Sequence, residues 1–314
     1  MGGADGIVGE FLDLKRKTDA DLLLMQVGDF YEFFGDDAET AAREMDLKVS
    51  QKSSHGSSYP MAGVPVDEVM PYVTGLVERG FRVAIADQHE TADGHARDVT
   101  RVVTPGTLLE ATDADAQYLA AVVDDDEGIG LAFADVTTGR FHVTTVADAD
   151  AALAECYRFD PAEILPGPSL RDGDLVGTLA EETDAAVTSF EANAFAPGAA
   201  AHAVREQFGA DVADSLALDV AGERAAGAVL AYVGETDPAV RGAMTRLRSY
   251  RADDHVALDV TTRRNLELTR TMTGGHEGSL FATMDHTETA AGGRLFREWL
   301  GRPIRDENEL SRRM

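Results

Sequence analysis

The sequence predicts an α/β protein whose C-terminal part is helical, and three observations lead to this prediction. An aromatic-rich run at 27–34 has strand character, and helical patterns flank it. Three apolar strand-like runs separated by two tight turns lie between residues 118 and 146. From about residue 221 onward, the apolar and small residues recur at helical spacing. We therefore expect two α/β domains and the first helices of a third.

The first segment, residues 1–112, has the elements of a small mixed α/β domain. Helical patterns occur at 7–17, 36–45 and 71–79. The second of these has two acids in its first turn, which favours a helix N-terminus, and the third ends at Gly80. A second strand is expected at 81–87, whereas the polar stretch 50–58 is expected to be a loop.

The middle segment, residues 113–235, predicts a second α/β domain. Its strands are expected at 118–123, 129–135 and 140–146, and a helix follows at 149–157. Tight turns between consecutive strands are typical of an antiparallel meander. This segment holds 24 of the 56 acids but only five of the 28 bases, so nucleic-acid contact is least expected here.

The last segment, residues 236–314, is less acidic and is expected to be helical. Helices are predicted at 261–272 and 289–300, and a further helix at 221–233 precedes them. Gly301 and Pro303 would end the second of these helices.

The overall charge of −28 at pH 7 argues at first sight against contact with nucleic acid, which normally requires a basic face. A cytoplasm of very high salt resolves this conflict, because repulsion between surface acids is screened within about 3 Å at molar ionic strength. Affinity gained by releasing counterions from phosphates also shrinks as salt rises. We therefore predict a halophile, in which any contact with nucleic acid would rely on stacking and on the shape of the nucleic acid.

Phe30 and Glu32 are the candidate binding residues. Side chains alternate between the faces of a strand, so these two would project together while Tyr31 and Phe33 point the other way. A flat ring beside a hydrogen-bonding acid suits stacking on a nucleobase while contacting one of its polar atoms. The plain alternative is an aromatic-rich strand that is simply buried.

Five short motifs in one order resemble the MutS family of DNA mismatch repair proteins. They are Gly-Asp-Phe-Tyr-Glu at 28–32, Met-Ala-Gly-Val-Pro at 61–65, and the runs at 83–88, 101–107 and 262–268. The resemblance implies a mismatch-recognition domain at 1–112, a ribonuclease-H-like α/β connector domain at 113–235, and the truncated start of an all-helical core domain at 236–314.

The resemblance also implies roles for individual residues. Phe30 would stack on a mispaired or unpaired base and kink the duplex, and Glu32 would hydrogen-bond to the displaced base. An ionised carboxylate only accepts hydrogen bonds, so contact with a ring nitrogen that is itself an acceptor would require a protonated Glu32. Lys52, Ser53 and Ser54 are candidates for contact with the DNA backbone, because they combine a cation with hydroxyl donors.

Two other functions remain open at this point. The connector could dock a repair partner of the MutL type. The acids Asp124, Asp125, Asp126 and Asp135 could instead hold the two magnesium ions of a ribonuclease-H-like nuclease, although a solvated turn in an already acidic protein is the favoured explanation of them.

The remaining expectations concern cofactors and location. None of the four lysines follows a glycine, so no P-loop is present, and ATP and magnesium are expected only in an ATPase domain outside this N-terminal fragment. The full-length family member is expected to dimerise. Cys156 is expected to be a buried thiol, and no metal ligand set is recognised. The start of the chain lacks a signal peptide and no run would span a membrane, so a cytoplasmic protein is expected.

Overall fold

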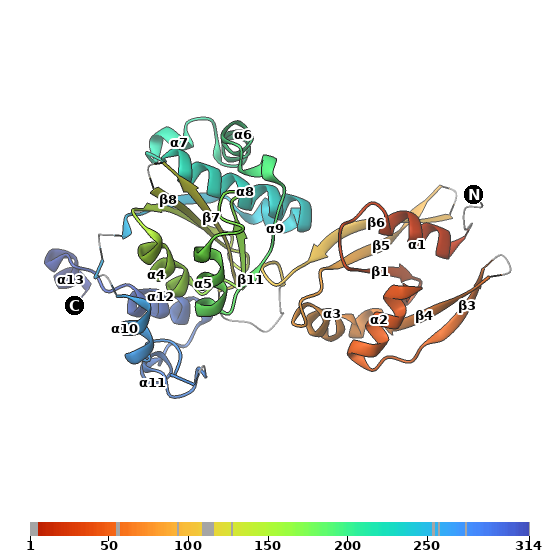
Figure 1. Cartoon of the computed structure of the whole chain (residues 1–314). Helices are drawn as coiled ribbons and strands as arrows, with labels where there is room; N and C mark the ends of the chain where they lie inside the picture. The colour runs from red at the N-terminus through yellow and green to blue at the C-terminus, as the bar shows by residue number, and fades with distance from the viewer. Residues whose placement is uncertain are drawn as a thin grey trace. The chain divides into compact units, whose positions relative to one another are not determined.

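The computed structural model describes residues 6–54, 57–92, 94–108, 116–126, 128–252, 255–256, 258–273 and 275–313. The chain divides into two compact units. Unit 1 comprises residues 1–108 with 234–238, and unit 2 comprises residues 109–233 with 239–314. Each unit contains a six-stranded sheet with helices on its faces (Figure 1).

The sheet of unit 1 has the strand order β3-β4-β2-β1-β5-β6. Its strands are β1 (Leu22–Val27), β2 (Phe30–Phe34), β3 (Ser50–Ser54), β4 (Ser57–Pro65), β5 (Val83–Thr91) and β6 (Gly94–Val103). Among these neighbouring strands, only β1 and β5 pair in parallel. The helices of this unit are α1 (Ile7–Lys15), α2 (Asp36–Met45) and α3 (Val69–Val77), with a 3-10 turn at Val66–Glu68.

The two faces of this sheet belong to separate apolar clusters. Tyr31 and Phe33 of β2 lie in the cluster that includes residues of α2 and α3. Phe34 lies in the cluster that includes residues of α1, where its ring meets Phe11 edge-on with centroids 5.2 Å apart. By strand alternation, Phe30 and Glu32 lie on the same face of β2 as Phe34. Of these three residues, only Phe34 belongs to the apolar cluster with α1.

The sheet of unit 2 has the order β11-β10-β7-β8-β9-β12. Its strands are β7 (Tyr118–Asp125), β8 (Gly128–Asp135), β9 (Arg140–Val146), β10 (Glu163–Pro166), β11 (Ala186–Val187) and β12 (Arg246–Ser249). Strands β7 to β9 form the expected antiparallel meander. Strands β10 and β11 continue the sheet in parallel from β7, which is the ribonuclease-H-like order.

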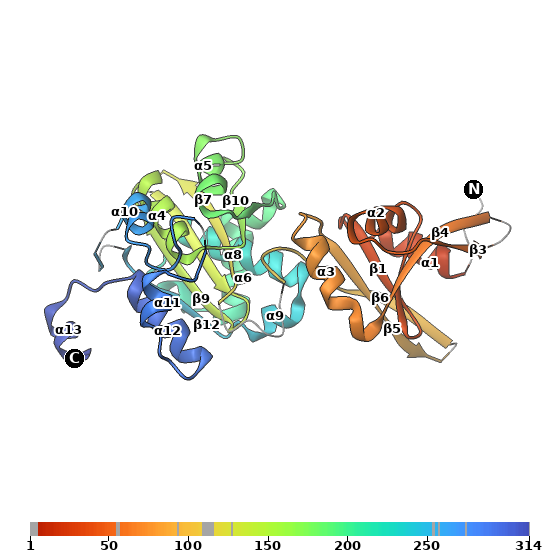
Figure 2. The ribbon, with the colours of Figure 1, turned by 90° about the horizontal axis from the view of Figure 1, so that it is seen from below.

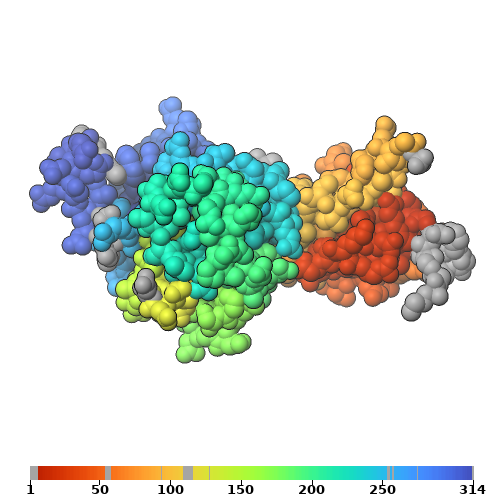
Figure 3. Space-filling model, turned by 90° about the horizontal axis from the view of Figure 1, so that it is seen from above, coloured from red at the N-terminus to blue at the C-terminus, as the bar shows by residue number. Residues whose placement is uncertain are grey.

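Helices cover both faces of this second sheet. Residues of α4 (Ala149–Phe159) and α5 (Asp174–Thr183) pack on one face. The other face is covered by α6 (Pro197–Phe208), α7 (Val212–Ser215), α8 (Val220–Thr236) and α9 (Pro238–Ala243). The space-filling view from above shows the turquoise to cyan helices as a continuous surface of the unit (Figure 3). Cys156 is a residue of α4 and is fully buried against the sheet, as expected.

Four helices complete unit 2: α10 (Val260–Asn265), α11 (Leu280–Met284), α12 (Ala290–Gly301) and α13 (Glu307–Arg313). Asp259, Ser279 and Thr289 cap the first three, each accepting a hydrogen bond from a backbone amide three residues on. Helix α10 lies beside α4 in both ribbon views (Figures 1 and 2). Within the described residues, no helix combines the length and the apolar character needed to cross a membrane.

The predicted α/β fold class with a helical end is confirmed, but three local predictions are wrong. Residues 50–58 are not simply a loop, because β3 and β4 pair as an antiparallel hairpin. The run 27–34 is two strands, since Gly28 and Asp29 turn the chain between β1 and β2. The helix expected at 261–272 ends at Asn265, and Glu267 soon after it has φ +46°. The domain boundaries at 112 and 235 stay predictions.

Close packing of α8 on α6 makes Gly227 intolerant of a side chain. A Cβ at Gly227 would lie 2.3 Å from the Cα of Ala200, far inside van der Waals contact. We expect Gly227→Ala to lower the free energy of unfolding by about 1–3 kcal/mol or more, measured by chemical denaturation in high salt. Gly177→Ala in α5 is the matched control, because nothing lies within 4 Å of its added Cβ. That control should raise stability by about 0.5–1 kcal/mol, and equal effects of the two variants would contradict the packing argument.

Candidate nucleic-acid interface

A two-residue turn places Phe30 at the start of β2. Val27 pairs with Phe30 across the β1–β2 hairpin, so Gly28 and Asp29 are its two central residues. Gly28 has φ +62°, and glycine at the first central position is what a tight type II′ hairpin turn requires. The amide of Val66 donates to the Asp29 carbonyl at 3.1 Å, which ties the turn to the end of β4.

Two glutamines hold the same turn from the other side. The Gly28 amide donates to Gln88 Oε1 at 3.2 Å, and the Gln88 amide donates to Gln26 Oε1 at 3.0 Å. Gln26 Nε2 in turn donates to the Gly28 carbonyl at 3.2 Å. These bonds join β1, the turn and β5. The turn that precedes Phe30 is therefore hydrogen-bonded both to the end of β4 and to β5.

Arg97 of β6 anchors this glutamine pair. Its guanidinium donates to the Gln26 carbonyl, to Gln88 Oε1 at 2.6 Å and to Glu10 Oε2 of α1 at 2.7 Å. The side chain of Arg97 is only 6% exposed, so these charge-assisted bonds are protected from water. We call Gln26, Gln88 and Arg97 the turn-support network.

Sequence reasoning missed this network. Gln88 stands inside one of the recognised motifs, but no spacing links it to Gln26 or to Arg97. The parallel pairing of β1 with β5 brings Gln26 and Gln88 together although they are about 60 positions apart, and the antiparallel pairing of β5 with β6 places Arg97 opposite Gln88.

Phe30 is the one exposed residue of β2. Its side chain is 47% exposed, whereas the next four residues of the strand are buried. Exposing a phenylalanine ring forfeits hydrophobic stabilisation, which is of the order of 2 kcal/mol for a fully buried ring. The ring is therefore presented to solvent by a backbone that is otherwise held tightly.

Glu32 is buried, with 9% of its surface exposed. Its Oε2 atom is fully buried and accepts no hydrogen bond within the described residues. Burial raises the pKa of this carboxyl above its ordinary value, while the nearby positive charges of Lys52 and Arg97 oppose that rise. A buried acceptor without a partner costs about 1–3 kcal/mol, so this oxygen is suited to a ligand that supplies a donor or to protonation.

Lys52 lies beside Glu32, although it was predicted as a contact for the DNA backbone. Its Nζ is 3.9 Å from Glu32 Oε2, which makes an ion pair but no hydrogen bond, and its side chain is 40% exposed. Ser53 is exposed on β3, and the side chain of Ser54 lies outside the described part of the chain. The hairpin therefore brings Lys52 toward the recognition pair, and contact of these three residues with DNA stays a prediction.

The acids considered for a nuclease do not converge on a metal site. Asp135 is buried and accepts hydrogen bonds from the Thr137 amide and from the hydroxyls of Thr137 and Thr138, so its carboxylate stabilises the β8–β9 turn. Asp125 forms an ion pair with Arg224 at 2.6 Å. In the described ranges, no group of three or more acids, histidines or cysteines is placed to hold a metal ion.

Comparison with protein families matches three consecutive domains along the chain. Residues 5–112 match MutS domain I, residues 117–245 match MutS domain II and residues 261–314 match MutS domain III.

Individual relatives agree with this assignment. The chain is 62% identical to DNA mismatch repair protein MutS 1 of Haloarcula marismortui over 324 residues, covering 100% of this chain and 35% of that protein. It is 59% identical to MutS 1 of Halobacterium salinarum, covering 98% of this chain and 36% of that protein. It is 36% identical to MutS of Pelotomaculum thermopropionicum, covering 98% of this chain and 37% of that protein.

The chain spans about a third of the length of these relatives, and two of them come from halophiles. With domains I, II and III matched in order over nearly all of its residues, the chain belongs to the MutS family of DNA mismatch repair proteins and corresponds to their N-terminal third.

Proposed function

We propose that this chain recognises mispaired or unpaired bases in double-stranded DNA by inserting the Phe30 ring and contacting the displaced base with Glu32. The observation that supports this most is the pairing of an exposed ring with a buried carboxylate oxygen that accepts no hydrogen bond from any residue that the structure describes. Strand alternation places both on one face of β2. Two residues that served only to pack the core would have neither an exposed ring nor a buried carboxylate oxygen without a hydrogen bond.

Stacking supplies the energy for this recognition. An aromatic ring stacked on a base contributes about 1–3 kcal/mol, and wedging a base step open costs a few kcal/mol. That cost is least where base pairing is already broken, so a mismatch is favoured over a perfect duplex. The turn-support network helps further, because a ring held in place loses little conformational entropy on binding.

Glu32 is proposed to add a hydrogen bond to the displaced base. The raised pKa makes its protonated form more accessible, and a protonated carboxyl can donate to a ring nitrogen. Exclusion of water by DNA and the negative phosphates would raise the pKa further.

Phosphate contacts are proposed to contribute little. The nearest lysine, Lys52, is already engaged with Glu32, and the net charge of −28 opposes approach to DNA. At the high salt in which we propose this protein works, counterion release is weak as well. Because phosphate contacts by residues such as Lys52 would add little affinity, binding by this chain should be modest and should depend strongly on Phe30.

Other properties proposed for the complete protein rest on family membership alone. They are ATP hydrolysis with magnesium in a domain outside this chain, dimerisation, docking of a MutL-type partner on the connector, and a cytoplasmic location. For the chain itself we propose recognition of a lesion without chemistry on it.

Replacing the ring tests the proposal directly. Phe30→Ala should weaken binding to a duplex with one mismatch by about five- to 150-fold, while binding to the matched duplex changes little. Fluorescence anisotropy with labelled duplexes in high salt measures both affinities. Leu12→Ala is the matched control, because it removes another exposed apolar side chain of unit 1, on α1. An unchanged preference for the mismatch in folded Phe30→Ala would refute the wedge.

The carboxyl is tested through its pH dependence. The folded-state pKa of Glu32 is raised, so the protonated, donating form is populated below that pKa and is lost as the pH rises through it. Mismatch affinity should therefore fall with rising pH in the parent chain. Glu32→Gln, which always carries N–H donors, should bind with little pH dependence. Parallel pH profiles for the parent and the variant would show that Glu32 does not donate to the base.

A further inference from the structure

An arginine-rich cavity of about 100 Å³ lies within unit 2, away from the strands discussed above. Its walls come from β9, α4 and the segment that carries α10 and α12. Seven arginines line it: Arg140, Arg158, Arg263, Arg270, Arg294, Arg297 and Arg302. Only three acids do so, namely Asp135, Asp160 and Glu298. In a chain with twice as many acids as bases, this reversal of local charge calls for a negative partner.

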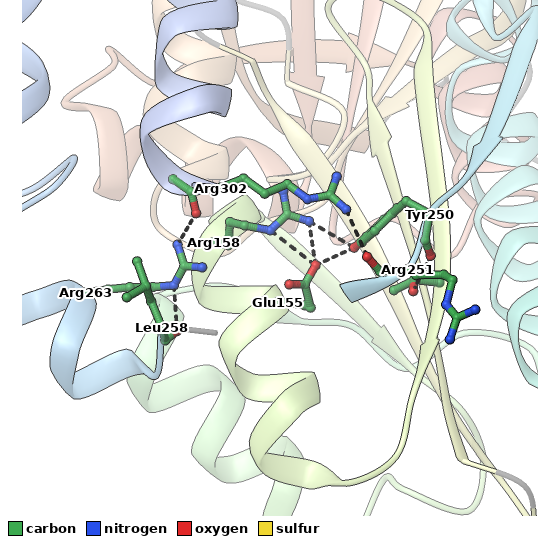
Figure 4. A network of polar contacts seen from close by, with 9 residues as sticks. Glu155, Arg158, Tyr250, Arg251, Leu258, Arg263 and Arg302 are labelled. Carbon is green, nitrogen blue, oxygen red and sulfur yellow. Dashed lines mark hydrogen bonds and ion pairs between the residues drawn. The ribbon is translucent and has the colours of Figure 1, made fainter. Parts of the chain in front are cut away.

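Arg158 is already neutralised. Its guanidinium forms an ion pair with Glu155 at 2.5 Å and donates to the Tyr250 hydroxyl at 3.0 Å, while that hydroxyl donates to the same carboxylate at 2.5 Å (Figure 4). Burial alone would raise the pKa of Glu155. The positive charge of Arg158 and the hydrogen bonds from Arg158 and Tyr250 outweigh it and hold that pKa below its ordinary value. This triad balances one cation with one anion, so the Glu155 carboxylate is already used by Arg158.

Arg263 and Arg302 have no carboxylate partner among the described residues. Arg263 donates to the carbonyls of Leu258 at 2.9 Å and Gly301 at 2.7 Å (Figure 4). Arg302 donates to the Arg251 carbonyl at 3.4 Å and lies 4.2 Å from the centre of the Tyr250 ring. Burial and the charge of Arg158 lower the pKa of Arg263 to about 10, and the same two causes lower the pKa of Arg302.

The other acids around the cavity do not offset these charges. Asp135 is held by the β8–β9 turn, and Glu298 is 3.8 Å from Arg140. Asp160 pairs with Arg270 at 2.6 Å. Even so, Arg270 Nε is buried and has no hydrogen-bond partner in the described residues. Within the described residues, the cavity therefore offers an unused N–H donor at Arg270 and the positive charges of Arg263 and Arg302, which bond only to carbonyls.

We propose that this cavity binds a small phosphate-type oxyanion, either free phosphate or the phosphate group of a nucleotide. Guanidinium groups match the oxygens of such an anion in paired hydrogen bonds, and several arginines suit a doubly charged anion better than a single carboxylate. The small volume favours a compact ion over a peptide. Because the site is partly enclosed, molar salt screens it less than it screens charges on the surface.

The position of the cavity gives the bound ion a structural consequence. Arg158 belongs to α4 on the connector sheet, whereas Arg263 and Arg302 belong to α10 and to the end of α12. An anion between them relieves their mutual repulsion and holds the C-terminal helices on the connector. The anion would bind only while α10 and the end of α12 are packed against α4. It should therefore raise the stability of this packed arrangement.

Titration of inorganic phosphate into the chain tests this proposal. The measurement is isothermal calorimetry in 2 M KCl at constant ionic strength, and saturable 1:1 binding is expected. Arg302→Gln should weaken it at least tenfold, whereas Arg205→Gln, an exposed arginine on α6, should leave it unchanged. Circular dichroism shows whether each variant is folded, and Arg270→Gln replaces Arg302→Gln if the latter unfolds.

Two further titrations identify the source of the phosphate group. Adenosine monophosphate that competes with phosphate would indicate a nucleotide, whereas binding of phosphate alone would indicate the free ion. Adenosine lacks the anion and should not bind. No saturable phosphate binding, equal affinity in a folded Arg302→Gln, or binding of adenosine as tight as that of the monophosphate would overturn the proposal.

Discussion

The hydrogen bond from the Gly28 amide to Gln88 is the contact on which the arrangement of the recognition pair depends. It fixes the turn from which β2 begins, and the direction of that turn decides which residues of β2 enter a core. Alternation then buries Tyr31 and Phe33 on one face and leaves Phe30 and Glu32 on the other. The strand β2 thereby has two roles. Burial of Tyr31 and Phe33 stabilises the sheet, and the strand held in this way keeps Phe30 and Glu32 in position on its other face.

Buried arginines have a similar structural use in both units. In each unit an arginine with a buried side chain joins elements that are distant in sequence. Arg97 connects β6 with β1 and α1, and Arg263 connects α10 with the end of α12. An arginine used in this way is shielded from solvent ions, so its hydrogen bonds persist at salt concentrations that abolish surface ion pairs.

Local patterns predicted much of the fold and of the site, and the failures have identifiable physical causes. The meander and the pairing of Phe30 with Glu32 follow from period-two alternation, which is a property of the strand alone. The turn-support network depends on the parallel pairing of β1 with β5, which no local pattern reveals. The β3–β4 hairpin was missed because serines and Pro60 are typical of loops, and these strands gain stability from pairing rather than from propensity. The helix at 261 was extended too far, since its early end depends on the left-handed backbone at Glu267.

The two carbonyl contacts of Arg263 also set the mechanical behaviour of the C-terminal helices. Its bond to Gly301 spans 38 residues, so one side chain closes a loop that contains α11 and α12. Closing a loop of that length has an entropic cost that is recovered only while the side chain stays in place. The segment should consequently open and close as a single cooperative unit, detectable as one group of amide protons that exchange with solvent together.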